Sequence, residues 1–141
     1  KLAQWAERYD VILAVENMAP GAIGDRSDEL LDLVTSVGSS HVRVCFDTGH
    51  AHVGSEGLIH ALEVLAPYIA VVHWNDNDRS SDQHLPPGRG DINWNAFFQT
   101  LLARAHPVYL SLEVRVPPNA TLKGIIHSAL SLIPRNAKVW M

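Results

Sequence analysis

The chain has little cysteine, no long apolar run and no excess of positive charge, and each absence narrows what it can be. Its single cysteine, Cys45, excludes an internal disulfide framework and is typical of a reducing compartment. Its place in an apolar run favours a buried packing thiol over a nucleophile. The apolar runs are all shorter than the roughly 20 residues that span a membrane, and no charged and apolar leader opens the chain. We therefore expect a soluble, cytoplasmic protein without membrane contact.

The net charge of −4, with an isoelectric point near 6.0, gives no general attraction to nucleic acid. Nucleic acid is therefore disfavoured as a partner, although a local basic strip is compatible with this charge. With 141 residues, 47% of them hydrophobic and 18% charged, the chain can bury the core of a single domain spanning residues 1–141. The first residue is Lys1 rather than Met, which is typical of a fragment or a processed product.

One unit, an apolar strand followed by a helix, recurs along the chain. The runs at residues 11–15, 42–46, 69–72 and 108–112 predict strands, and each is apolar nearly throughout, as in a parallel sheet covered on both faces. Helices are predicted at residues 2–9, from a cap at Ser27 to Gly38, from a cap at Ser55 to Pro67, around residues 97–102, and at residues 121–133 with Thr121 as the cap. This alternation predicts an α/β fold.

Each predicted strand is followed by a residue that can bind a metal ion or transfer a proton. The four strand-end residues are Glu16, Asp47, His73 and Glu113, and a polar turn is predicted to begin at Asp47 and to include residues 47–49. In (β/α) barrels the carboxyl ends of the strands surround one active site, so these side chains are expected to converge. A doubly wound open sheet also places its site at strand ends, but usually with a glycine-rich phosphate loop, which this sequence lacks.

Taken singly, each strand-end residue is also explained as the cap of a turn or as the partner of an arginine. The set of four favours a cation site. Three carboxylates and an imidazole suit several divalent ions, so Mn, Mg, Co and Zn are all candidate cofactors.

The length of the chain limits how much of a barrel it can form. A complete eight-stranded barrel takes about 250 residues, so four strand–helix units predict a parallel (β/α) half-barrel. A half-barrel has two open sheet edges, which tend to pair with other strands. We expect these edges to be covered by a missing N-terminal half, by a second copy of the chain in a homo-oligomer, or by a rearranged sheet.

Several ordered motifs give the chain a resemblance to a known family. They are Glu16-Asn17-Met18, the run FDTGH that ends at His50, the run HWNDN that begins at His73, the loop sequence DQHLPPGRG that begins at Asp82, and Glu113. Together they resemble the C-terminal half, strands 5 to 8, of the xylose-isomerase-like TIM-barrel superfamily. That group contains sugar phosphate isomerases and epimerases together with the metal-dependent nuclease endonuclease IV. The resemblance covers nearly the whole chain and implies a TIM-barrel fold.

The resemblance also implies roles for individual residues. In the ketose epimerases, one divalent ion is held at the positions of the four strand-end residues, and the histidine matching His50 helps to hold the substrate. In endonuclease IV, a cluster of zinc ions uses those positions together with an Asp-x-His that matches Asp82 and His84. Asp82, His84 and His50 are therefore candidates for a second metal site. Two further histidines of that nuclease come from its N-terminal half and have no counterpart here.

Catalytic and substrate-binding roles follow from the chemistry of a sugar epimerase. Glu16 and Glu113 are expected to remove a proton beside the carbonyl and to return it on the other side, with His50 as a further catalytic residue, while the metal stabilises the enediolate. Trp74, next to His73, either walls the substrate pocket or packs in the core. Arg89 either binds a phosphate or carboxylate of the substrate or belongs only to a turn.

Three functions are compatible with a half-barrel that carries these candidate metal ligands. We expect a divalent-metal-dependent isomerase or epimerase that acts on a small sugar or sugar phosphate. The alternative is an endonuclease-IV-like zinc phosphodiesterase that cleaves abasic DNA with a metal-activated water. A third possibility is a non-catalytic half-barrel. Metal content separates the three, because they bind one ion, several zinc ions and no ion respectively.

Overall fold

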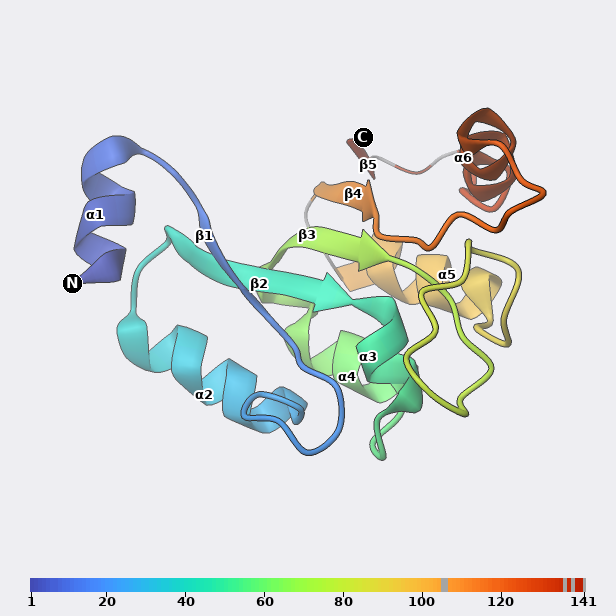
Figure 1. Cartoon of the computed structure of the whole chain (residues 1–141). Helices are drawn as coiled ribbons and strands as arrows, with labels where there is room; N and C mark the ends of the chain where they lie inside the picture. The colour runs from blue at the N-terminus through green and yellow to red at the C-terminus, as the bar shows by residue number, and fades with distance from the viewer. Residues whose placement is uncertain (105–106, 136, 138, 141) are drawn as a thin grey trace.

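The computed structural model describes residues 1–104, 107–135, 137 and 139–140. Its centre is a parallel five-stranded sheet in the order β1-β2-β3-β4-β5, so that strands adjacent in sequence are adjacent in space (Figure 1). The strands are β1 (Leu13–Glu16), β2 (Val42–Asp47), β3 (Ile69–Trp74), β4 (Val108–Leu112) and β5 (Val139–Trp140). The first four confirm the predicted strands, whereas β5 lies in a tail for which the sequence predicted nothing.

Helices alternate with the strands and confirm the predicted α/β half-barrel. They are α1 (Leu2–Tyr9), α2 (Ser27–Val37), α3 (Thr48–Val53), α4 (Leu58–Leu65), the short 3-10 helix η1 (Ala66–Tyr68), α5 (Trp94–Arg104) and α6 (Leu122–Leu130). Helices α2, α4 and α5 cover one face of the sheet (Figure 1). Their apolar side chains pack there with alternate strand residues such as Val44, Phe46 and Val72. Because side chains alternate along a strand, the intervening residues Cys45, Asp47 and His73 belong to the opposite face.

Two of the three predicted helix caps are wrong. Ser27 is the first residue of α2 rather than its cap, because its N–H and its hydroxyl both donate to the carboxylate of Glu56, at 2.6 and 2.7 Å. Ser55 does not cap α4, which begins after Gly57 at a φ of 80°, a conformation that glycine adopts without strain. The predicted cap at Thr121 is confirmed, since its hydroxyl accepts a hydrogen bond from the N–H of Gly124 at 3.1 Å.

The polar stretch after β2 is also more ordered than the sequence suggested. The sequence predicted a polar turn at residues 47–49, but residues 48–53 form helix α3, and Asp47 is its cap. The Asp47 carboxylate accepts a hydrogen bond from the N–H of His50 at 2.7 Å. A carboxylate that caps a helix is held in one orientation by the first turn, so this cap fixes Asp47 at the end of its strand.

The sheet has an open edge at β1. Within the described residues this strand pairs with β2 alone. Next to it, Trp5, Tyr9, Val11 and Ile12 are each more than half exposed, at 57, 58, 53 and 52%. On the other side β4 pairs with β5, so the second open edge lies one strand further along than expected. An exposed strand edge bordered by apolar side chains is a surface suited to pairing with further chain.

Cys45 has the packing role that its sequence context predicted. It lies in β2 with 5% of its surface exposed, and burial raises the pKa of its thiol to about 12, with the neighbouring carboxylates adding to the shift. Such a thiol stays protonated and unreactive at neutral pH. Among the described residues, the structure also contains no helix that is both long and apolar enough to cross a bilayer.

Candidate metal centre

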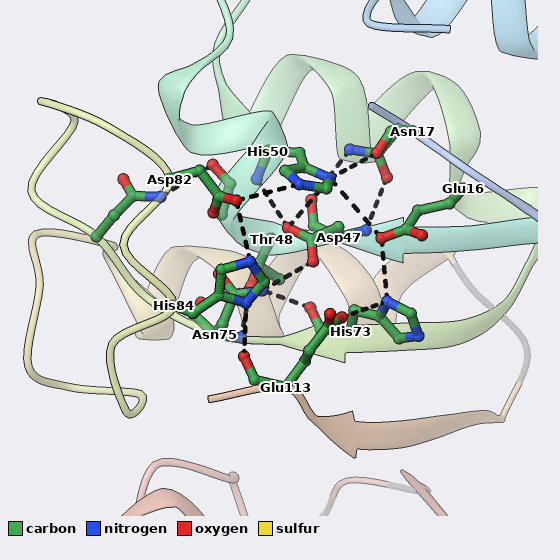
Figure 2. A network of polar contacts seen from close by, with 12 residues as sticks. Glu16, Asn17, Asp47, Thr48, His50, His73, Asn75, Asp82, His84 and Glu113 are labelled. Atoms are coloured by element: carbon green, nitrogen blue, oxygen red, sulfur yellow. Dashed lines mark hydrogen bonds and ion pairs between the residues drawn. The ribbon is translucent and has the colours of Figure 1, made fainter. Parts of the chain in front are cut away.

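The structure brings the four strand-end residues together at the carboxyl end of the sheet (Figure 2). One ligand atom from each of Glu16, Asp47, His73 and Glu113 lies within 4.8 Å of the ligand atoms of the other three. The Nδ1 atom of His73 contacts Glu16 Oε1 at 3.0 Å and Glu113 Oε2 at 2.7 Å. The two glutamates therefore meet at one imidazole, as ligands around a shared cation do.

Asp47 is the most tightly held member of this cluster. It is fully buried, and its two carboxylate oxygens accept hydrogen bonds from the N–H of His50 and from the side-chain amide of Asn75, at 2.7 and 2.8 Å. Asn17 binds the Asp47 backbone in both directions, accepting from its N–H at 2.7 Å and donating to its carbonyl at 3.0 Å. Burial raises the pKa of Asp47 against the opposing effect of the bond from His50. A cation would offset this cost of burying the charge.

The sequence interpretation gave no role to Asn17 and Asn75, although both stood in the motifs. They position Asp47 rather than contribute to the cluster themselves. The available signal was their position in the sequence. Asn17 directly follows Glu16, and Asn75 lies two residues after His73. An amide at such a place can bind the neighbouring strand end, but the sequence does not reveal which strand end it meets.

Gly49 leaves room for Asn75. A Cβ atom at Gly49 would overlap the side-chain oxygen of Asn75, and this oxygen is buried without a hydrogen-bond partner. Because the same Asn75 amide group donates to Asp47, any displacement of Asn75 changes the orientation of a candidate ligand. Glycine at position 49 is therefore part of the construction of the site.

We expect Gly49→Ala to weaken Mn²⁺ binding by about 10- to 100-fold, the usual cost of losing a group that supports a metal ligand. The physical reason is that the added methyl group pushes Asn75 away from Asp47. Competition against a chromophoric chelator measures the affinity. Gly124→Ala in α6 is the matched control and should leave it unchanged. An unaltered affinity in Gly49→Ala would show that Asn75 does not orient Asp47.

A second cluster lies beside the first and consists of His50, Asp82 and His84 (Figure 2). The Nε2 atoms of the two histidines lie 3.4 and 3.0 Å from Asp82 Oδ2, respectively. The other oxygen of Asp82 is buried without a hydrogen-bond partner within the described structure. Two imidazoles and a carboxylate with a free oxygen make a donor set that fits Zn²⁺ or a similar ion.

Hydrogen bonds at Nδ1 fix the tautomers of His50 and His84. Nδ1 of His50 lies 2.9 Å from the carbonyl oxygen of Asn17, and Nδ1 of His84 lies 3.0 Å from that of Glu113. A carbonyl only accepts hydrogen bonds, so in the neutral rings both protons are assigned to Nδ1 and both Nε2 lone pairs face Asp82. Metal-binding histidines are usually oriented in this way. For His84, burial lowers the pKa, but the bond to Glu113 and the nearby Asp82 outweigh it and raise the pKa overall.

His50 lies between the two clusters. Its Nδ1 atom is 3.7 Å from Glu16 Oε1 and 3.7 Å from Asp47 Oδ1, while its Nε2 atom faces Asp82. It can therefore either contact a substrate beside the first cluster or bind an ion of the second cluster. The tautomer with the proton on Nδ1 leaves the Nε2 lone pair facing Asp82 and so favours the role of a ligand.

Two predicted substrate-binding residues lie elsewhere. Of the two roles predicted for Trp74, the structure contradicts the wall of the substrate pocket and agrees with core packing: it is 1% exposed and packs edge-to-face on Trp94 and Phe98. It follows His73 directly in β3, and consecutive strand residues face opposite sides of the sheet. Arg89 is exposed and lines a separate cavity of about 520 Å³ between its loop and α6.

The donor sets fit divalent ions. The first cluster gathers three carboxylates and one imidazole, which without a cation would leave excess negative charge in a partly buried place. Manganese, magnesium, cobalt and zinc all accept such ligands. The second cluster adds two imidazoles, which favour zinc and cobalt over magnesium.

Comparison with known proteins finds relatives of two kinds. The D-psicose 3-epimerase of Enterocloster bolteae is 30% identical over 103 residues, which is 72% of this chain and 33% of that protein. A protein named Probable endonuclease 4 from Acholeplasma laidlawii is 34% identical over 113 residues, covering 69% of this chain and 38% of its own length. The chain thus spans well under half of these curated relatives.

Comparison with solved structures also finds proteins that superpose on this chain. A D-tagatose 3-epimerase-like protein superposes with a TM-score of 0.78 at 27% identity, covering 93% of this chain and 49% of that one. The fold is also that of the IOLI protein, solved with a bound zinc atom, at a TM-score of 0.76 and 23% identity, over 93% of this chain and 50% of that one. The model of one family, the xylose isomerase-like TIM barrel, matches residues 1–133. The chain therefore belongs to the xylose isomerase-like TIM barrel family.

Proposed function

We propose that this chain forms the metal-binding half of a divalent-metal-dependent isomerase or epimerase that acts on a sugar or sugar phosphate. The observation that carries the proposal is the convergence of Glu16, Asp47, His73 and Glu113 within 4.8 Å. The relatedness to D-psicose 3-epimerase supports a keto sugar as the substrate class.

The proposed chemistry is proton transfer at a carbon next to a carbonyl. A bound divalent ion supplies charge stabilisation for the oxygens of the substrate when that proton leaves. Glu16 and Glu113 have side chains that are 31 and 46% exposed, so both are open to a ligand above the sheet. They come from opposite edges of the four-strand set and meet at His73, which suits removal of a proton on one face and its return on the other.

Other residues have supporting roles in this proposal. Asp47 is the ligand with the least freedom, because Asn17, Asn75 and the first turn of α3 hold it. His50 contacts the substrate if the second cluster holds no ion. Arg89 lines a cavity that contains none of the cluster residues, so it has no role at the reacting carbon in this proposal.

We further propose that the working enzyme contains a second half. The open edge of β1, bordered by the exposed Trp5, Tyr9, Val11 and Ile12, is the surface that this half covers. Either an N-terminal half or a second copy of the chain can supply it. The coverage of 49% of a solved relative fits the need for a complementary half of similar size.

A second candidate function is supported by the second cluster. The neutral tautomers of His50 and His84 direct both Nε2 atoms at Asp82, which suits a further zinc ion. More than one ion around a phosphate is typical of metal-dependent phosphodiesterases. The similarity to a protein named Probable endonuclease 4 adds to this alternative, an endonuclease-IV-like cleavage of abasic DNA.

Metal content and activity measured together decide between the candidates. The chain is purified in the assembly that supplies the second half and is loaded with Mn²⁺, Co²⁺ or Zn²⁺. Its metal is quantified, and the assembly is assayed for epimerisation of D-psicose and for cleavage of an abasic-site oligonucleotide. One ion per chain with sugar epimerisation is the expected result. Several zinc ions per chain with DNA cleavage would contradict it in favour of the nuclease. A chain that binds no ion would contradict both and indicate a non-catalytic half-barrel.

A further inference from the structure

Asp76 is a fully buried carboxylate outside both clusters. Its Oδ1 atom accepts hydrogen bonds from the N–H groups of Asn77 and Ile92, at 2.9 and 3.2 Å. Its Oδ2 atom accepts from the N–H of Gly88 at 2.8 Å and from the indole N–H of Trp94 at 2.9 Å. All four are uncharged donors, and together they give each oxygen of the carboxylate two hydrogen bonds.

These donors are spread over the whole connection between β3 and α5. Asn77 begins the loop, Gly88 lies on its far side, Ile92 is on its return and Trp94 is the first residue of α5. One side chain thus joins the start, the middle and the end of the loop. A loop of this length has no regular ladder of its own, so the conformation depends on such a centre.

The backbone of the loop closes around the same point. Asp76 and Leu85 exchange two backbone hydrogen bonds, each of 2.8 Å, and the N–H of Asp91 donates to the carbonyl of Asn77 at 2.9 Å. A Cβ atom at Gly90 would overlap both the Asp76 carboxylate and the Asn77 carbonyl, so the chain passes directly over the carboxylate there. The loop is therefore packed onto Asp76.

Asp82 and His84 lie on the part of the loop that this centre controls. Leu85, which pairs with Asp76, directly follows His84. His84 has a φ of 50°, an unusual conformation for a residue with a side chain, and its carbonyl accepts a hydrogen bond from the N–H of Arg115 at 2.8 Å. Such a conformation persists only where the surroundings determine it. The pairing at Leu85 supplies that constraint on one side and Arg115 supplies it on the other.

We propose that Asp76 is a positioning residue, which holds the loop from residue 77 to 93 in the conformation that brings Asp82 and His84 to His50. The consequence for metal binding rests on the second candidate function, which places a further zinc ion at His50, Asp82 and His84. The consequence for the loop itself does not, because the hydrogen bonds of Asp76 are independent of any ion.

The test is Asp76→Asn in the 141-residue chain, with Asp91→Asn as the matched control. Asparagine keeps the size of the side chain, but its amide group donates rather than accepts, so one pair of N–H donors loses its acceptor. Asp91 is an exposed carboxylate of the same loop. Hydrogen exchange of the Leu85, Gly88 and Ile92 amides is measured without metal, and Zn²⁺ binding is measured by competition.

In Asp76→Asn, we expect the three amides to lose protection while those of β2 and β3 keep theirs. The second Zn²⁺ should bind about 10- to 100-fold more weakly, as when a group supporting a ligand is lost, and the first should bind with its normal affinity. Asp91→Asn should behave like the unmodified chain in both measurements. Binding of the first ion reports correct folding, because its ligands come from four different strands or strand ends.

Retained amide protection in Asp76→Asn, or a second ion that binds as tightly as before, would overturn the proposal. If this variant loses both ions, Trp94→Phe decides, because it removes one donor and leaves a ring in the core. Selective weakening of the second ion in Trp94→Phe supports the proposal, and equal weakening of both contradicts it. If the unmodified chain binds only one Zn²⁺, the proposed second metal site is disproved. The role of Asp76 in holding the loop is then decided by the hydrogen-exchange data alone.

Discussion

Asp47→Asn is expected to weaken binding of a divalent ion by more than about 100-fold, since losing a residue that merely supports a ligand already costs about 10- to 100-fold. The substitution removes a charged candidate ligand. It also places the new amide group against the side-chain amide of Asn75, which in the unmodified chain donates a hydrogen bond to the Asp47 carboxylate. Asp47 is fully buried and is the N-cap of α3, so no neighbouring carboxylate can take its place. Titration with Mn²⁺ and Zn²⁺ measures the loss.

Asp32→Asn is the control for this change, because Asp32 is an exposed carboxylate on α2. It should bind both ions as the unmodified chain does. Circular dichroism and thermal unfolding without metal show whether Asp47→Asn keeps the fold. A folded Asp47→Asn variant with normal affinity for both ions would remove Asp47 from the ligand set and would leave the cluster of carboxylates without its proposed purpose.

The place of the cluster of candidate ligands was predictable because it depends on two regular features of the sequence. Parallel strands end at the same edge of a sheet, so residues that follow apolar runs meet there. Side chains alternate along a strand, so Asp47 and His73 share the face opposite the helices. The same alternation excludes Trp74 from that face, and sequence reasoning that applied it strictly would have placed this tryptophan in the core with Phe98.

The errors have a different physical origin. Serine is a common helix cap, but Ser27 instead donates hydrogen bonds to the carboxylate of Glu56, which lies 29 residues further along the chain. Asp47 looked like the start of a turn and is the cap of a helix. In each case a polar side chain had several satisfactory partners, and the tertiary structure decided between them. The role of Asp76 was not predictable for the same reason, since its donors lie between one and eighteen residues away.

Glu16→Gln and Glu113→Gln are each expected to lower the rate of epimerisation by about 10²- to 10⁴-fold, the usual contribution of a positioned acid or base. If each glutamate serves one face of the carbon, each variant should still remove the proton of one epimer and fail with the other. Exchange of that proton with deuterated solvent measures this directly. It is followed by NMR for both epimers of a keto sugar, in the assembly in which the unmodified chain is active.

Glu16 and Glu113 are also candidate metal ligands, so the exchange is measured at saturating metal to separate chemistry from affinity. Glu63→Gln is the matched control, because Glu63 pairs with Arg104 on the surface at 3.4 Å and should exchange both epimers normally. A pure loss of metal affinity would be restored by excess ion for both epimers alike. Opposite selectivity of the two variants is instead the signature of two bases, because only a residue that transfers the proton distinguishes the two faces of the carbon. Identical exchange patterns in Glu16→Gln and Glu113→Gln would exclude that division of roles.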